Sequence, residues 1–256
     1  METLTIVKVG GGILENPSDM EVFLNQFAAI DGKKILVHGG GREATRMMEK
    51  LGIPAKMVEG RRITDAQTLD IVTMVYGGLI NKRTVVALQV IGCNAIGLTG
   101  ADAGLIIANK RSVKEIDYGF VGDVERVNRT IFMQLVESGL TPVLAPLTFD
   151  INGSMLNTNA DTIASEVAIA LSGTYEVSLV FCFEKTGVLS NPNDENSLIK
   201  DIDLKTFTEL KGKGIITDGM IPKLDSCFNA LKKGVTEVWI TNAKAVNSKQ
   251  GTKLII

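Results

Sequence analysis

Residues 35–42 read Ile-Leu-Val-His-Gly-Gly-Gly-Arg, an apolar run that ends in one histidine and three glycines. Residues 43–48, Glu-Ala-Thr-Arg-Met-Met, continue with helical spacing. The sequence therefore predicts a strand, a glycine turn and the start of a helix. Glycines let a ligand approach the backbone closely, and the N–H groups at a helix start favour phosphate or carboxylate. The stretch thus predicts an anion-binding turn.

A second copy of this arrangement lies at the N-terminus, where residues 4–9, Leu-Thr-Ile-Val-Lys-Val, lead into Gly10-Gly11-Gly12. Either turn alone has a plainer explanation, in which glycine serves only the chain geometry. That explanation is weaker for two similar turns in one small domain. We therefore expect the chain to hold an anion between them.

Several motif-based functions are excluded. The string His-Gly-Gly-Gly also occurs in the oxyanion loops of esterases, but those enzymes need G-x-S-x-G and a separate histidine base. The chain lacks G-x-S-x-G, and His38 is its only histidine. The phosphate-binding pattern G-x-x-x-x-G-K-[ST] and the dinucleotide pattern G-x-G-x-x-G are also absent. A serine hydrolase, a P-loop enzyme and a Rossmann-type site are therefore not expected.

The composition excludes further classes. A chain of 256 residues with 45% hydrophobic content can form one large domain or two closely packed lobes. A net charge of -2, 5% aromatic residues and no basic block argue against nucleic-acid binding. No apolar run approaches the ~18 residues of a membrane span, and no signal peptide is evident. Three scattered cysteines and one histidine predict reduced thiols, no zinc site and a cytoplasmic location.

Strand and helix patterns alternate along the chain, which predicts an α/β protein with a mostly parallel sheet and helices on both faces. Asn16-Pro17 is expected to begin the first long helix, with Asn16 as its N-cap. A hairpin or irregular loop is expected over 56–63, and a hairpin turn at Asn152-Gly153. The remaining predicted strands are 34–38, 94–98, 104–109, 120–127, 142–147, 176–182 and 235–240. The remaining predicted helices are 43 to about 51, 128–138, 160–171, about 203–212 and 219–233.

Residues 64–67, Thr-Asp-Ala-Gln, form a capping-box pattern that predicts a long helix from Thr64 to about Val90. This helix is apolar on more than one side and contains Gly77-Gly78 in its middle. Such a helix either crosses a twin helix in a dimer or lies buried between its own sheet and the next layer. The sequence leaves both possibilities open.

Three charged residues stand at positions suited to phosphate chemistry. Lys8 lies two residues before the first glycine turn, and Asp161 falls in the first turn of a predicted helix. Lys223 follows early in a helix whose predicted N-cap is Asp218. Two plainer explanations stay open, in which Asp161 only stabilises the helix dipole and Lys223 is only a solvated surface residue.

In order, the chain carries K-V-G-G, V-H-G-G-G, G-R-R-I-T, L-N-T-N-A-D and G-I-I-T-D-G-M-I-P-K. These strings resemble the acetylglutamate kinases of the amino acid kinase superfamily, from about Leu4 to Lys253. The resemblance implies a three-layer αβα sandwich with a mostly parallel open sheet, the carbamate kinase-like fold. It also implies an N-lobe of about 1–172 for the acyl amino acid and for dimerisation, and a C-lobe of about 173–256 for ATP.

The resemblance further implies phosphoryl transfer from MgATP to the side-chain carboxylate of N-acetyl-L-glutamate, in arginine biosynthesis. Lys8 and Lys223, one from each lobe, neutralise the transferring group, and Asp161 orients both lysines. The implied substrate-binding residues are Gly40, Gly41, Arg61, Arg62, Asn157 and Asn159. The implied nucleotide-binding residues are Gly10, Gly11, Glu184, Lys185, Gly187, Ile216 and Thr217.

This chemistry suits the composition. A carboxylate nucleophile is already ionised at neutral pH, so the reaction needs no general base and a single histidine suffices. The reaction needs alignment of two anions and neutralisation of the charge on the transferring group. Magnesium is expected to sit on phosphates and water, since no cluster of carboxylates is evident.

The chain departs from the family pattern at two places that bear on function. Arg61 replaces the usual aliphatic residue before Arg62, which suggests N-succinyl-L-glutamate as an alternative substrate. Arg61 otherwise points to solvent or to a partner subunit. Residues 183–187, Phe-Glu-Lys-Thr-Gly, replace a Ser/Thr-Asp-Val-x-Gly-like turn, with Glu184 in place of the aspartate.

Only seven residues precede Lys8, whereas arginine-inhibited members carry an extra N-terminal helix that links dimers into hexamers. The expectation is therefore a homodimer that arginine does not inhibit. The nearest rival enzymes are sister kinases that act on carbamate, aspartate, glutamate or uridylate, and the N-T-N-A-D and G-R-R-I-T strings argue against them. A regulatory amino-acid-binding module of the same fold is the remaining alternative, and it has no need for Lys8, Asp161 and Lys223 together.

Overall fold

The structure, a computed structural model, describes residues 1–58, 60–191, 193–216 and 220–256. Contacts divide the chain into two compact units. Unit 1 contains Met1–Ile35 and Ala164–Ile256, and unit 2 contains Leu36–Ile163. The boundaries fall inside strand β2 (Lys33–His38) and helix α7 (Ala160–Leu171) rather than in loops.

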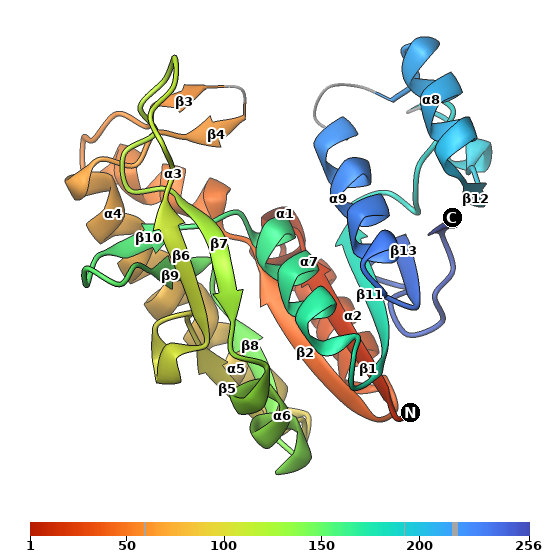
Figure 1. The fold of residues 1–256 in the computed structure, drawn as a ribbon, viewed down its shortest axis with the longest axis horizontal. Coiled ribbons are helices and arrows are strands. Elements are labelled where there is room, and N and C mark those ends of the chain that lie inside the picture. Colours follow the sequence, from red (N-terminus) through yellow and green to blue (C-terminus); the bar gives the residue numbers. More distant parts are fainter. Residues whose placement is uncertain (59, 192, 217–219) are drawn as a thin grey trace. The chain divides into compact units, whose positions relative to one another are not determined.

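Unit 1 is built on parallel strands (Figure 1). Its strand order is β12-β14-β13-β11-β1, in which only the β13–β14 pair is antiparallel. Helix α9 packs along β13, and α1 packs on α2. The elements wholly within this unit are β1 (Thr3–Val9), α1 (Gly11–Glu15), α2 (Pro17–Ala28), β11 (Glu176–Phe183), η3 (Glu195–Ser197), β12 (Asp201–Ile202), α8 (Leu204–Gly212), α9 (Ile221–Lys232), β13 (Glu237–Asn242) and β14 (Thr252–Leu254).

Unit 2 combines a parallel strand set, in the order β2-β8-β5, with a four-stranded sheet in the order β10-β9-β6-β7. Helices α5 and α6 both pack against β8. The elements wholly within this unit are α3 (Gly41–Lys50), β3 (Met57–Val58), β4 (Arg61–Arg62), α4 (Ala66–Val72), η1 (Thr73–Ile80), α5 (Asn81–Val90), β5 (Ala95–Leu98), η2 (Asp102–Gly104), β6 (Ile106–Lys110), β7 (Gly122–Val127), α6 (Arg129–Glu137), β8 (Thr141–Leu144), β9 (Leu147–Phe149) and β10 (Met155–Asn157).

The caps of two helices show how far local sequence determines local structure. Helix α2 begins as predicted, because Asn16 Oδ1 accepts hydrogen bonds from the N–H groups of Ser18 and Asp19. The prediction for Thr64 was wrong. Asp65 caps α4 by accepting from the Thr68 N–H at 2.9 Å. Thr64 is buried instead and forms a β-bridge with Gly119.

The long helix from Ala66 to Val90 is confirmed, but its middle is a π-helix, η1, that contains Gly77 and Gly78. By length and mean hydropathy it is apolar enough to span a bilayer, as are core helices of water-soluble proteins. One side of it forms a core cluster with α3 and the start of β9. The buried members of that cluster are Ala44, Met48, Ile71, Val72, Val75, Tyr76, Ala145 and Leu147.

Most predicted strands and helices are confirmed within a few residues, including the hairpins at 56–63 and at Asn152-Gly153. Two differences stand out. The predicted strand 142–147 is divided, because β8 ends at Leu144 and β9 begins at Leu147. The short helix α1, directly after the first glycine turn, was not predicted. Asp218, the predicted cap of α9, lies outside the described residues, and the described helix begins at Ile221.

Candidate active site

Lys8 and Lys223 converge on the ring of Phe183 in unit 1. The Lys8 Nζ lies 4.9 Å from the ring centroid, and the Lys223 Nζ lies 4.3 Å from it. Both distances fall within the ~6 Å range of a cation–π contact. Both lysines belong to compact unit 1, and the division into an N-lobe and a C-lobe with one lysine each stays a prediction. The two cations thus gather at one side chain.

Strand register explains how Lys8 reaches this ring. Lys8 on β1 pairs with Phe181 on the parallel strand β11, so the two side chains leave the same face of the sheet. Phe183, two residues further on, projects from that face too. The rings of Phe181 and Phe183 are stacked, with centroids 6.3 Å apart and planes inclined by 8°. Lys8 is 7% exposed, which is unusual for a lysine without a binding role.

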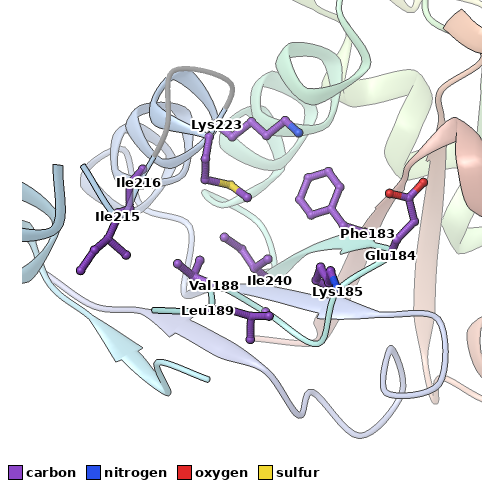
Figure 2. Close-up of a pocket in the computed structure, with 11 residues that line it drawn as sticks. Phe183, Glu184, Lys185, Val188, Leu189, Ile215, Ile216, Lys223 and Ile240 are labelled. Carbon is purple, nitrogen blue, oxygen red and sulfur yellow. The ribbon is translucent and has the colours of Figure 1, made fainter. Parts of the chain in front are cut away.

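A cavity of about 300 Å³ lies beside this ring (Figure 2). Its wall is mainly aliphatic, with the charged side chains of Glu184, Lys185 and Lys223 near Phe183 (Figure 2). The remaining lining residues are Gly187, Val188, Leu189, Ile215, Ile216, Met220 and Ile240. An apolar cavity with cations at one side is suited to a base joined to phosphates.

Four of the predicted nucleotide-binding residues line this cavity: Glu184, Lys185, Gly187 and Ile216. A Cβ at Gly187 would lie 2.6 Å from both Leu198 Cδ1 and Thr252 Oγ1, so the close approach of β14 requires glycine there. Thr217 lies outside the described residues.

The first glycine turn joins β1 to α1. The Gly10 N–H donates to the Cys182 carbonyl at 3.0 Å, which fixes the turn against the end of β11, next to Phe183. Gly11 is the first residue of α1. A Cβ at Gly10 would lie 3.8 Å from Phe183 Cδ1, so the start of this turn is close to the ring that both lysines contact.

The second glycine turn lies in unit 2, where β2 ends and α3 begins. A Cβ at Gly40 would lie 2.6 Å from Ile80 Cδ1 and 2.8 Å from the Tyr76 ring, so η1 packs directly on the Gly40 backbone. A Cβ at Gly41 would meet no atom within 4 Å. Gly40 is thus required by packing, while Gly41 presents open backbone.

The Arg62 side chain packs against this second turn and is 7% exposed. Its Nη2 donates to the Gly41 carbonyl at 2.8 Å and to Thr45 Oγ1 at 2.7 Å, and its Nη1 donates to Met48 Sδ at 3.3 Å. Burial raises the pKa of the nearby Tyr76 hydroxyl, and the positive charge of the Arg62 guanidinium opposes that rise. These partners are all uncharged, so a carboxylate ligand would complement this buried cation.

Arg61 does not share this environment. Arg61 and Arg62 are consecutive residues of β4, so their side chains leave opposite faces of the strand. Arg61 is exposed where Arg62 is buried. The structure therefore brings Arg62, and not Arg61, to the second glycine turn.

The two asparagines of the predicted substrate site both precede α7, which begins at Ala160. Asn157 Nδ2 donates to Thr64 Oγ1 at 3.0 Å, and Thr64 Oγ1 donates to the Arg62 carbonyl at 3.3 Å. Asn159 caps α7, because its Oδ1 accepts from the N–H groups of Asp161 and Thr162. Asn157 is thus joined to Arg62 through Thr64, and Asn159 has a structural role at the helix start.

Asp161 occupies the first turn of α7, as expected, and its backbone belongs to unit 2. Its role toward the two lysines of unit 1 stays a prediction.

His38, the only histidine, is fully buried at the end of β2. Burial lowers its pKa from 6.5 to about 4, and the hydrogen bond to the Gly39 carbonyl opposes this shift only in part. His38 Nδ1 lies 2.9 Å from that carbonyl, and Nε2 lies 3.2 Å from Asn81 Nδ2. The side chain is therefore neutral at physiological pH, and its contacts are structural.

Sequence reasoning missed four residues of these two sites: Thr45, Tyr76, Asn81 and Phe183. Tyr76 belongs to the long helix whose sides were predicted only to be apolar. Asn81 begins the polar run 81–84, Asn-Lys-Arg-Thr, so the sequence does not single it out. The roles of Thr45 and Phe183 depend on contacts between distant segments, which no local pattern reveals.

Within residues 1–58, 60–191, 193–216 and 220–256, no group of three His, Cys, Asp or Glu side chains is placed to hold a metal ion. A magnesium ion that arrives with nucleotide phosphates has no need of such a cage.

Comparison with known proteins gives matches over most of the chain. The model of the amino acid kinase family matches residues 3–242. An acetylglutamate kinase of Bacteroides fragilis is 56% identical over 253 residues, covering 99% of this chain and 97% of the relative. The crystal structure of a Streptococcus mutans UA159 protein superposes with a TM-score of 0.82 at 28% identity, covering 98% of each chain.

The carbamate kinase of Giardia lamblia bound to AMP-PNP shares the fold at 15% identity, with a TM-score of 0.69. The match covers 99% of this chain and 98% of that chain. The predicted mostly parallel α/β fold of the carbamate kinase-like type is confirmed. With its family match over residues 3–242 and its 56% identity to a curated relative, the chain belongs to the amino acid kinase family and, within it, to the acetylglutamate kinases.

Proposed function

We propose that this chain transfers the γ-phosphoryl group of ATP to the side-chain carboxylate of N-acetyl-L-glutamate, a step of arginine biosynthesis. The observation that carries the proposal is the convergence of Lys8 and Lys223 beside the apolar cavity. The chain's 56% identity to an acetylglutamate kinase supports it.

The two lysines supply what phosphoryl transfer needs most. The substrate carboxylate and the triphosphate repel one another, and negative charge spreads over the transferring group. Two ammonium groups at one place offset that charge in the transition state. His38 is buried, neutral and hydrogen-bonded through both ring nitrogens, so it is no general base. An ionised carboxylate requires none.

In unit 1, we propose that the base of ATP occupies the aliphatic cavity and that its phosphates lie toward Lys8, Lys223 and the first glycine turn. Gly10 and Gly11 present backbone there, and Glu184, Lys185, Gly187, Ile216 and Thr217 are the proposed neighbours of the nucleotide. Mg2+, bound by phosphate oxygens and water, supplies further charge neutralisation.

In unit 2, we propose that Arg62 binds the α-carboxylate of the substrate, with the backbone of Gly40 and Gly41 and the amide of Asn157 on its other polar groups. The partners described above for the buried guanidinium are all uncharged. An entering carboxylate would therefore supply its counter-charge. We propose that part of the role of Asn159 is indirect, because it holds the start of α7 in place as its cap.

N-acetyl-L-glutamate is favoured over N-succinyl-L-glutamate. The succinyl alternative depends on Arg61 as a second cation in the pocket, but Arg61 is exposed and leaves the opposite face of β4 from Arg62. A regulatory binding module is also disfavoured, because such a module has no need for two lysines at one ring.

We further propose a cytoplasmic homodimer with no nucleic-acid or membrane partner. Large apolar side chains on the outer side of the 66–90 helix support dimerisation, with Met74, Val86 and Val90 60%, 63% and 81% exposed. The opposite side of this helix packs in the core of unit 2, which argues against a membrane span. The net charge of -2 argues against nucleic acid.

The test is ATP turnover with hydroxylamine trapping of the acyl phosphate, comparing N-acetyl-L-glutamate with N-succinyl-L-glutamate. We expect preference for the acetyl compound. Lys8→Ala should lower kcat by about 100-fold to 1000-fold, as loss of one charge-stabilising donor does, while equilibrium binding of the acyl amino acid persists. No turnover with either compound, or an unchanged Lys8→Ala enzyme, would refute the proposal.

A further inference from the structure

Arg62 carries a positive charge into the interior of unit 2. Its side chain is 7% exposed, and its Nη2 donates to the Gly41 carbonyl at 2.8 Å and to Thr45 Oγ1 at 2.7 Å. Its Nη1 donates to Met48 Sδ at 3.3 Å. In the described part of the chain, none of these hydrogen-bond partners carries a counter-charge, although an unpaired cation is costly to bury. The molecule thus keeps this charge available for an anionic ligand.

The hydroxyl of Thr45 has a fixed direction. Thr45 lies in α3, where its Oγ1 donates to the Gly41 carbonyl, four residues earlier, at 3.0 Å. A hydroxyl has one hydrogen, so Oγ1 receives the hydrogen bond from Arg62 through a lone pair. The Gly41 carbonyl accepts from both Thr45 and Arg62. The hydroxyl, the carbonyl and Nη2 therefore form a closed triangle of hydrogen bonds, in which two acceptors fix the position of Nη2.

An uncharged acceptor suits this place. A hydrogen bond from a guanidinium to an oxygen atom is stronger than a bond between two neutral groups, because its donor is charged. A carboxylate at this place would also neutralise the guanidinium, whereas a hydroxyl leaves its charge unchanged. The acidic residue in the first turn of α3, Glu43, forms an ion pair with Arg46. Thr45 can therefore hold Arg62 in place without weakening its attraction for an anion.

We propose that Thr45 is a positioning residue, whose hydroxyl holds the Arg62 guanidinium in the orientation that binds the α-carboxylate of the acyl amino acid. The proposal deepens the proposed function and rests on it for the identity of that ligand. The effect of Thr45 passes through Arg62, so it should be confined to ligands that carry this carboxylate.

A plainer role for such a hydroxyl is to bond only with its own helix. Thr84 has this role, because its Oγ1 donates to the Ile80 carbonyl, also four residues earlier, at 2.9 Å. Thr84 lies in α5 of the same unit, and its described hydroxyl bond involves no arginine. Thr84→Val therefore removes the same kind of helix bond and is the matched control for Thr45→Val.

The first test compares KM and kcat for N-acetyl-L-glutamate. We expect Thr45→Val and Thr45→Ala to raise KM about ten-fold, as for loss of one hydrogen bond to a charged group, with kcat within about two-fold of the wild type. Thr45→Ser, which keeps the hydroxyl, and Thr84→Val should leave KM within about two-fold. Thermal unfolding shows whether each variant is folded at the assay temperature. An unchanged KM in both variants without the hydroxyl, or an equal rise in Thr84→Val, would overturn the proposal.

The second test removes the carboxylate from the ligand instead of the hydroxyl from the protein. N-acetyl-4-aminobutanoate differs from N-acetyl-L-glutamate only in lacking the α-carboxylate, and it keeps the carboxylate that accepts the phosphoryl group. We expect it to be a poorer substrate whose kcat/KM changes less than about two-fold in Thr45→Val, whereas kcat/KM for N-acetyl-L-glutamate falls about ten-fold. Equal losses for the two compounds would show that Thr45 only maintains the fold, and would refute the positioning role.

A third measurement separates this proposal from the proposed function. Binding of N-acetyl-L-glutamate without ATP, measured by calorimetry, requires Arg62 but no phosphoryl transfer. We expect Kd to rise about ten-fold in Thr45→Val and to stay within about two-fold of the wild type in Thr45→Ser and Thr84→Val. If binding shows this pattern without any turnover, the proposed function fails and the role of Thr45 stands. Equal affinity of the wild type and Thr45→Val would refute that role even in an active kinase.

Discussion

His38 and Asn81 form a buried pair whose hydrogen-bond directions can be assigned. Asn81 Nδ2 lies 2.9 Å from the Val143 carbonyl, which only accepts, and 3.2 Å from His38 Nε2. The amide nitrogen donates one hydrogen to each. His38 Nε2 therefore accepts, and Nδ1 carries the proton that it donates to the Gly39 carbonyl at 2.9 Å. This pair fixes the peptide that opens the second glycine turn.

The first prediction concerns the ionisation of this histidine. Because His38 is the only histidine in the chain, one imidazole signal in a nitrogen-detected NMR spectrum reports its state. We expect the Nδ1–H tautomer and no protonation until the pH approaches about 4, the value to which burial lowers the pKa of His38. Titration near pH 6.5 would contradict the buried pair.

The same shift makes stability depend on pH. The folded-state pKa of His38 lies below the unfolded value of 6.5, so its stabilising effect is complete above pH 6.5 and declines toward pH 4. Between pH 6.5 and 5, we expect the free energy of unfolding to fall by about 2 kcal/mol more in the wild type than in His38→Gln. Urea unfolding at each pH measures this, and equal slopes for the two proteins would refute the prediction.

Gly40 and Gly41 should respond differently to a methyl group. Gly40→Ala places a Cβ 2.6–2.9 Å from Ile80 and Tyr76, so we expect a loss of stability of about 1–3 kcal/mol. Gly41→Ala meets open space, so we expect stability within about 0.5 kcal/mol of the wild type. If the Gly41 backbone contacts the acyl amino acid, that variant raises KM for it at unchanged stability. Unfolding curves and initial rates of both variants test these expectations. Equal stability of the two variants would contradict the packing of Ile80 and Tyr76 on the Gly40 backbone.

Arg62 and Arg61 provide a matched pair for substrate binding. We expect Arg62→Lys to raise KM for N-acetyl-L-glutamate about 100-fold, since lysine cannot reproduce the bidentate contact with a carboxylate. We expect Arg61→Leu to change kcat/KM for that substrate less than about three-fold, as for an exposed residue outside the pocket. Initial rates with the acetyl and succinyl compounds test both. A large loss in Arg61→Leu, confined to the succinyl compound, would restore the alternative substrate.

The proposed dimer should depend on the outer side of the 66–90 helix. The double variant Val86→Glu, Val90→Glu places charges in an apolar patch and should give a monomer by light scattering. Ile256→Glu is the control, because Ile256 is 72% exposed and lies at the C-terminus. If the double variant is still a dimer, the interface does not lie on this side of the helix.

The sequence predicted the features that depend only on residues close together in the chain. Asn16 caps α2 because an asparagine followed by proline suits a helix start in any context. The glycine turns, most strand positions and the α/β class followed from patterns of the same kind. Fold and family could therefore be predicted almost completely.

The remaining features depend on contacts between distant segments. Thr64 fits a capping box, but its hydroxyl interacts with Arg62 and Asn157. Asp65 is therefore the residue that caps the helix. Nothing in the sequence around Gly77 predicts a π-helix whose tyrosine packs on Gly40. The gathering of Lys8 and Lys223 at Phe183 joins three segments that only the fold brings together.

The three buried cysteines allow transient opening of each unit to be measured by chemical modification. All of them lie within the described residues as thiols, with Cys93 in unit 2 and Cys182 and Cys227 in unit 1. Burial raises the pKa of the Cys182 thiol, which slows its reaction with alkylating reagents further. Alkylation followed by mass spectrometry therefore measures how often each unit exposes its interior. Because Cys182 precedes Phe183, its protection by ATP would report directly on the nucleotide side.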